Sequence, residues 1–265
     1  MDLVSYAHWS QWYDLFYSTE SGEEIDFYVQ EALAAKGPVL EIGVGTGRIA
    51  IPIALRGIEV FGVDMSPDML GIAEAKASAA SPLTGSLTLT QADMRTLRLE
   101  KTDFALVTIP ARTLLLATTP EEQADTLCSA ARHLRPGGRL VFNLFNPTPD
   151  LIFDDSDDPV MIGDVTDQAT GKTFRLSAVN RFDPETQINE ATQVVEEVRT
   201  DRTTEVVAEL PVRLRYLFPH EVFSMLEETN LRVEAVYGWF DRSPFDEECD
   251  EIIFVASRRD EIRTR

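Results

Sequence analysis

Three glycines stand at alternate positions in the segment Glu41-Ile42-Gly43-Val44-Gly45-Thr46-Gly47. Apolar residues before them predict a strand over Pro38 to Ile42, and the apolar spacing after them predicts a helix over Ile49 to Leu55. Glycine has no Cβ atom, so such a loop bends tightly and lets a ligand approach its backbone. A glycine-rich turn between a strand and a helix is typical of nucleotide-binding α/β proteins.

Two carboxylates follow the next two predicted strands. Asp64 comes directly after the strand expected over Ile58 to Val63, and Asp93 follows the strand expected over Ser86 to Thr90. The carboxyl ends of parallel strands share one edge of a sheet, where ligands bind in open α/β folds. One carboxylate there is suited to accept hydrogen bonds from the two ribose hydroxyls, and the other from an adenine amino group. Taken singly, each Asp is also explained as a helix cap or a solvated loop residue.

The glycine pattern does not fit every nucleotide-binding class. The nicotinamide fingerprint needs glycine at the sixth position counted from Gly43, and that position is Arg48. The Lys and Ser or Thr that end a phosphate-binding loop are also missing. A nicotinamide-binding or non-catalytic Rossmann protein therefore remains only as an alternative.

The order of elements predicts an α/β fold. Strands and helices alternate up to about residue 145, as in doubly wound parallel sheets. Period-2 patterns then predict antiparallel strands over Thr173 to Phe182, Gln187 to Val198 and Glu205 to Tyr216. We therefore expect N-terminal lid helices over 1–36, a Rossmann-like domain over 37–149 and 217–265, and an antiparallel β cap over 150–216, inserted after the fifth strand.

The joint pattern resembles the class I S-adenosylmethionine-dependent methyltransferases. Glu41 to Gly47, Asp64, Asp93 and the late Leu134-Arg135-Pro136-Gly137-Gly138 are similar to the successive motifs of that superfamily. The resemblance implies a Rossmann-like, doubly wound, mostly parallel seven-stranded sheet with a small antiparallel β insertion. It also implies S-adenosyl-L-methionine as cofactor, S-adenosyl-L-homocysteine as product, and methyl transfer by in-line displacement to a small-molecule nitrogen or oxygen. Another S-adenosylmethionine-using enzyme or a protein methyltransferase is the alternative.

The resemblance assigns roles residue by residue. Glu41 and Gly43 are expected near the amino-acid part of the cofactor, Asp64 at the ribose, Met65 beside the adenine and Asp93 at its amino group. Tyr13 and Asp14 are similar to a Tyr-Asp pair in the N-terminal lid of many small-molecule methyltransferases. The complete expected cofactor site is Tyr13, Glu41, Gly43, Gly45, Gly47, Arg48, Asp64, Met65, Asp93, Met94 and Ile109.

The acceptor side has weaker signals. The loop after the fourth strand reads Thr108-Ile109-Pro110-Ala111-Arg112 and lacks the Asn- or Asp-Pro-Pro-aromatic motif of enzymes that methylate nucleic-acid bases. Tyr13 and Arg112 are the catalytic candidates. Trp9, Arg112, Asn146, Arg215 and Trp239 are the expected substrate-binding residues.

Composition limits the partners. The formal net charge of -21, without a basic cluster, argues against nucleic acid and anionic membranes. No apolar run approaches the roughly 20 residues of a membrane span, and the first residues lack the order of a secretory signal, so we expect a cytoplasmic protein. Two cysteines without ligand spacing predict no metal site. A small-molecule substrate is expected, and a homodimer interface is the alternative role of the insertion.

Overall fold

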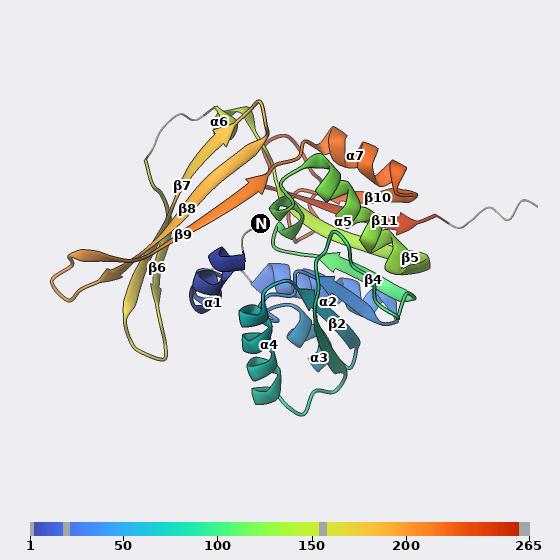
Figure 1. Cartoon of the computed structure of the whole chain (residues 1–265), viewed down its shortest axis with the longest axis horizontal. Coiled ribbons are helices and arrows are strands. Elements are labelled where there is room, and N and C mark those ends of the chain that lie inside the picture. The colour runs from blue at the N-terminus through green and yellow to red at the C-terminus, as the bar shows by residue number, and fades with distance from the viewer. Residues whose placement is uncertain (1–2, 18–21, 154–157, 260–265) are drawn as a thin grey trace, which may run out of the picture.

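The computed structural model describes residues 3–17, 22–153 and 158–259. Its main body is a seven-stranded sheet in the order β10-β11-β5-β4-β1-β2-β3, in which only β11 runs antiparallel to its neighbours. This confirms the doubly wound, mostly parallel sheet (Figure 1). The strands are β1 (Val39–Ile42), β2 (Glu59–Asp64), β3 (Ser86–Gln91), β4 (Phe104–Ile109), β5 (Leu134–Phe145), β10 (Leu231–Tyr237) and β11 (Glu251–Arg258).

Helices cover both faces of this sheet. One face is covered by α5 (Pro120–His133) and α7 (Pro219–Glu228), and the other by α2 (Gly22–Ala35) and α3 (Ala50–Leu55). The central strands β1 and β4 are buried along their whole length, which is why they read as unbroken apolar runs. Side-chain hydroxyls cap two of the helices at their starts, because that of Ser66 accepts from the Met69 amide and that of Thr119 accepts from the Glu122 amide.

The insertion forms a separate antiparallel sheet in the order β6-β7-β8-β9. Three of its strands, β7 (Thr173–Asp183), β8 (Ile188–Val198) and β9 (Thr204–Arg215), were expected from their alternation, whereas β6 (Val160–Thr166) was not. It is an edge strand with Val160, Met161 and Ile162 exposed in a row and only Val165 buried, so burial does not impose a period of two on its sequence. The short helices η1 (Thr113–Leu116) and α6 (Pro149–Ile152) were also not expected.

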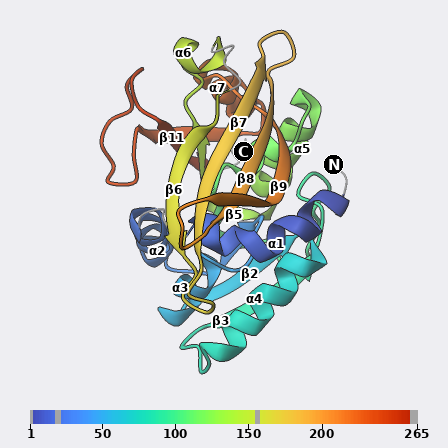
Figure 2. The same cartoon turned by 90° about the vertical axis from the view of Figure 1, so that its left-hand side faces the viewer.

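The N-terminal helix α1 (Leu3–Tyr17) lies between the insertion and the Rossmann-like body (Figures 1 and 2). Trp9 is buried together with Met69 of α4 (Pro67–Ala79) and with Phe174 and Leu210 of the insertion. Trp12 packs edge-on against Phe174, with ring centroids 5.3 Å apart. The second helix, α2, instead packs on the main sheet, so we keep the lid interpretation for α1 alone. Residues 1–2, 18–21, 154–157 and 260–265 of the expected ranges lie outside the described residues.

A buried cluster around Arg215 joins the insertion to the main body. Its guanidinium donates to Gln123 Oε1 on α5 at 2.7 Å and to Glu221 Oε1 on α7 at 3.1 Å, and the Gln123 amide donates back to the Arg215 carbonyl at 2.8 Å. Gln187 also accepts from the guanidinium. Arg215 is only 5% exposed and lines neither of the two cavities described below, so the expectation that it binds substrate finds no support in its position. Arg215 alternates with Val212 and Leu214 along β9, and α5 and α7 of the Rossmann-like body cover its face at this end of the strand.

Replacing Arg215 with Met should lower the free energy of unfolding by about 3–5 kcal/mol, because Glu221 and the two glutamines lose a buried charged partner. Arg213→Met is the matched control on the same strand, where the Arg213 side chain is 61% exposed and contacts Glu190 at 3.7 Å. Surface pairs of that kind contribute about 1 kcal/mol or less. Urea unfolding of both variants measures the difference, and equal destabilisation would contradict this account of the cluster.

Candidate functional site

The glycine loop between β1 and α3 turns with three glycines in the left-handed region, at φ angles of +75° for Gly43, +52° for Gly45 and +76° for Gly47. A Cβ atom on Gly43 would lie 2.3 Å from Thr113 Cγ2, and one on Gly47 would lie 2.9 Å from Ile51 Cδ1. At Gly45 the nearest atoms are those of the Tyr13 ring, 3.9 Å from such a Cβ. Gly43 and Gly47 are therefore required for packing, while Gly45 keeps open a narrow space beneath Tyr13.

Asp64 ends β2 directly beside this loop. Its Oδ2 accepts from the Gly45 amide at 2.9 Å, and its Oδ1 accepts from the Ser66 amide at 2.8 Å. Burial raises the pKa of Asp64, and the hydrogen bonds from these amides oppose that shift. An ionised carboxylate has further lone pairs, so Asp64 can accept additional hydrogen bonds from a ligand.

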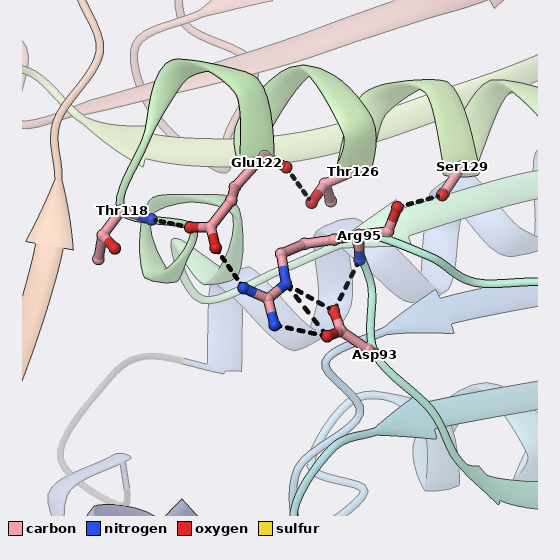
Figure 3. Close-up of polar contacts among 6 residues, drawn as sticks. All are labelled: Asp93, Arg95, Thr118, Glu122, Thr126 and Ser129. Carbon is pink, nitrogen blue, oxygen red and sulfur yellow. Dashed lines mark hydrogen bonds and ion pairs between the residues drawn. The ribbon is translucent and has the colours of Figure 1, made fainter. Parts of the chain in front are cut away.

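Asp93, after β3, is held by an arginine two residues later (Figure 3). The Arg95 guanidinium donates to both Asp93 oxygens, from Nε at 2.9 and 3.1 Å and from Nη2 at 2.6 Å, and the Arg95 amide donates to Oδ1 at 2.9 Å. Nη1 of the same guanidinium contacts Glu122, whose other oxygen accepts from the Thr118 amide at 2.9 Å. The Arg95 side chain lowers the pKa of Asp93, so this carboxylate stays ionised and its orientation is fixed from α5.

These groups face one cavity. Gly43, Gly45, Asp64, Met65, Asp93 and Met94 form its floor at the carboxyl ends of the strands. Trp9 and Tyr13 of α1 form one wall, and residues 111–113 with Leu116 form another. Gln193, Val212 and Leu214 of the insertion form the roof. The structure therefore brings together most of the residues that were expected to bind the cofactor. The sequence predicted the inserted segment, but it did not identify the three residues that form the roof.

Polar contacts hold α1 against the glycine loop. The Asp14 carboxylate accepts from Thr46 Oγ1 at 2.6 Å and from Lys76 Nζ at 3.0 and 3.1 Å, and Lys76 Nζ also donates to Thr46 Oγ1 at 3.2 Å. This places Tyr13 over Gly45. Burial is the main cause that raises the pKa of Tyr13 well above its usual value, so the phenol stays protonated. Sequence reasoning missed Lys76, whose position on α4 gave no local signal.

Arg112 lies where this cavity meets a second one. Arg112 and the preceding Ala111 both have left-handed backbones, at φ angles of +59° and +54°. Arg112 Nε donates to Glu251 Oε1 at 2.7 Å, and the other Glu251 oxygen accepts from Asn143 Nδ2 at 3.0 Å. Arg112 is therefore held from β11. The second cavity is lined by Tyr17, Glu24, Ala111, Arg112, Asn143, Trp239, Phe240 and Glu251.

Several expected site residues lie outside the main cavity. Ile109 is fully buried in the core, and neither Gly47 nor Arg48 lines the cavity. The Arg48 guanidinium pairs with Glu24 and lies over the Tyr17 ring. Trp239 lines the second cavity and donates from Nε1 to Glu23 at 2.7 Å. Asn146 donates to the carbonyls of Glu247 and Cys249 at 3.1 and 2.9 Å, so its amide shapes a loop. We leave these residues out of the proposed contacts.

Glu41 is buried beneath the glycine loop and is only 1% exposed. Its Oε2 has no hydrogen-bond partner among the described residues. Burial raises its pKa from 4.5 to about 8, although Arg48 and the Ala50 amide act in the opposite direction. Because Glu41 is buried, it does not line the cavity, and its position does not support the expected contact with a ligand.

Comparisons with known proteins agree on one class. A family model described as a methyltransferase domain matches residues 39–138. A putative methyltransferase of Bacillus subtilis, YqeM, is 30% identical over 165 residues, and the match covers 60% of this chain and 60% of that protein. The CcbJ methyltransferase of Streptomyces caelestis is 28% identical, with 90% of each chain covered and a TM-score of 0.74. CalS10 of Micromonospora echinaspora, a SAM-bound amino pentose methyltransferase, shares the fold at 20% identity, with 97% of each chain covered and a TM-score of 0.70.

The fold, the glycine loop with its two carboxylates and these matches identify a class I S-adenosylmethionine-dependent methyltransferase domain. S-adenosylmethionine is the cofactor of this class. The chain spans about 60% of the length of the curated relative YqeM, so the acceptor has to be inferred from this chain itself. Among the described residues, no helix is long and apolar enough to cross a membrane.

The buried Glu41 makes a testable contribution to the pH dependence of stability. Between its unfolded pKa of 4.5 and its folded pKa of about 8, only the folded state keeps the proton. Stability therefore falls as pH rises through this window, by up to about 1.4 kcal/mol per pH unit. Glu41→Gln removes this dependence, so its stability relative to the wild type should rise from pH 5 to pH 8.

The measurement is urea unfolding of the ligand-free proteins at several pH values. Glu74→Gln, at an exposed position on α4, is the control and should follow the wild type at every pH. A constant difference between Glu41→Gln and the wild type across this range would refute the assignment of a protonated Glu41.

Proposed function

We propose that the chain transfers a methyl group from S-adenosylmethionine to a small-molecule nitrogen or oxygen, with an amine as the preferred acceptor. The observation that carries the proposal is that Gly45, Asp64 and Asp93 line one cavity, whose roof comes from a separate sheet. When bound, S-adenosylmethionine would supply an electrophilic methyl carbon on a positively charged sulfur, and the neutral thioether of S-adenosylhomocysteine would be the leaving group of an in-line displacement by an acceptor lone pair.

The floor of the cavity suits the nucleoside part of that cofactor. Asp64 offers carboxylate lone pairs to the two ribose hydroxyls, and Asp93 offers them to the adenine amino group. Arg95 holds Asp93 ionised, so Asp93 accepts hydrogen bonds without donating them. Met65 and Met94 supply polarisable apolar surface beside these carboxylates. Gly45 has no Cβ atom between its backbone and the Tyr13 ring, so the backbone of the loop is open to a ligand in the cavity.

The walls suit an acceptor that needs no base. Among the described residues that line the cavity there is neither His nor Lys. Tyr13 stays protonated because it is buried, and the Arg112 guanidinium is permanently charged and paired with Glu251. We therefore assign Tyr13 and Arg112 to positioning and to excluding water. A neutral amine attacks a methyl group without losing a proton first, whereas most hydroxyls require a base.

Amine-bearing substrates are compatible with this fold. CalS10, with which this chain shares the fold, is an amino pentose methyltransferase. Positioning alone can supply roughly 7–11 kcal/mol of barrier reduction when two reactants are held in line. A rigid floor and a separate roof provide such positioning without a dedicated catalytic base.

Asp64→Ala should weaken S-adenosylmethionine binding at least tenfold. Hydrogen bonds to a charged acceptor contribute about 1.5–3 kcal/mol each, and this variant loses two. Titration calorimetry measures the affinity, and thermal unfolding checks that the variant is folded. Asp68→Ala, at an exposed position on the first turn of α4, is the control and should bind like the wild type. Wild-type affinity in folded Asp64→Ala would place the cofactor elsewhere.

A panel of matched amines and alcohols, scored by release of S-adenosylhomocysteine, tests the activity itself. We expect at least one small amine to raise the release rate tenfold or more above the acceptor-free rate, and its alcohol analogue to have a much smaller effect. Asp64→Ala is the negative control for the assay. If the cofactor binds but no amine or alcohol stimulates release, the proposed reaction is wrong, although the cofactor site stands.

A further inference from the structure

Gln193 of β8 lies on the apolar inner face of the insertion. Side chains two residues apart on a strand share a face, and Val195 on the same strand is fully buried. Opposite Gln193 in the sheet stand Ala178 on β7 and Leu210 on β9. Leu210 and Val195 pack in the cluster that contains Trp9 of α1. Gln193 is thus a polar side chain surrounded by apolar neighbours.

The side-chain carbonyl oxygen of Gln193, Oε1, is buried and is left without a hydrogen-bond partner in the part of the chain that the structure describes. Leaving a buried acceptor unpaired is costly, and native structures keep few such groups. An apolar side chain at this position would avoid the free-energy cost of burying an unpaired oxygen. Stability of the fold therefore does not explain why an amide stands here.

Gln193 also lines the main cavity, as part of its roof. The other two roof residues, Val212 and Leu214, are apolar. Asp64 and Asp93 line the cavity from the floor, which belongs to the main sheet. Gln193 is therefore the polar residue that the insertion contributes to the lining of this cavity.

We propose that Gln193 binds the methyl acceptor by hydrogen bonding to a neutral hydroxyl or amide group on an otherwise apolar small molecule. This inference rests on the proposed function and specifies its acceptor. A carboxamide both donates and accepts, so it suits uncharged groups of this kind, and it carries no charge to attract a phosphate. The apolar side chains of Trp9, Leu116, Val212 and Leu214 suit the body of such a molecule.

The first test uses the ligand-free protein. Gln193→Leu removes the unpaired amide and keeps much of the volume, so it should raise the Tm by about 2–4 °C. Thr192→Val is the matched control, because Thr192 is adjacent in the chain and points to the opposite face of the sheet. A Tm that falls in Gln193→Leu would mean that the amide supports the fold, and this would overturn the inference.

The second test measures binding with S-adenosylhomocysteine at saturation. The probes are cyclohexylamine and the 2-, 3- and 4-aminocyclohexanols, which differ only by a hydroxyl group. We expect the wild type to bind one of the amino alcohols at least fivefold more tightly than cyclohexylamine, and Gln193→Leu to lose this preference while Thr192→Val keeps it. A preference that survives in Gln193→Leu, or the absence of any preference or binding in the wild type, would overturn the inference.

The two proposals fail separately in this design. If S-adenosylhomocysteine itself does not bind the wild type, the proposed function is wrong. If S-adenosylhomocysteine binds with normal affinity to both the wild type and Gln193→Leu, and the hydroxyl preference is absent, only the assignment of Gln193 fails.

Discussion

The hydrogen bond from the Gly45 amide to the Asp64 carboxylate is the contact on which the site depends. It forms where the chain turns at Gly45 with a positive φ of 52°, directly beside the end of β2. The bond ties the loop after β1 to the neighbouring strand, and it also favours the ionised form of a carboxylate whose pKa burial raises. Loop shape and charge at the site are therefore set by one interaction. Tyr13 and the contacts of Asp14 then close the loop from above.

The parts of the site that depend on local sequence were predictable. A strand, alternate glycines and a helix in direct succession define the loop, and the strand ends place Asp64 and Asp93 at one edge. The fold class followed from the alternation of strands and helices, and the three regular strands of the insertion followed from their period of two. These features are encoded over a few neighbouring residues, so pattern and propensity suffice to find them.

Features that depend on long-range contacts were not predictable. The Arg95–Glu122 pair links residues 27 positions apart, and Arg112 meets Glu251 across 139 positions. No local pattern shows that Arg215 is buried, because its neighbours on β9 alternate as in a solvated strand. The sequence of the edge strand β6 has no period of two, because most residues on each of its two faces are exposed. Gln193 appeared as an ordinary polar residue until the sheet placed it opposite Leu210.

The floor and the roof of the cavity come from separate stretches of the chain. The floor belongs to the main sheet and its loops, up to Leu116, whereas the roof residues Gln193, Val212 and Leu214 stand within an insertion that leaves after β5 and returns before α7. Roof side chains can therefore change without altering the strand register that shapes the floor. In evolutionary terms the two halves are modular, and under the proposed function the choice of acceptor can diverge in one lineage while the cofactor-binding floor is inherited unchanged.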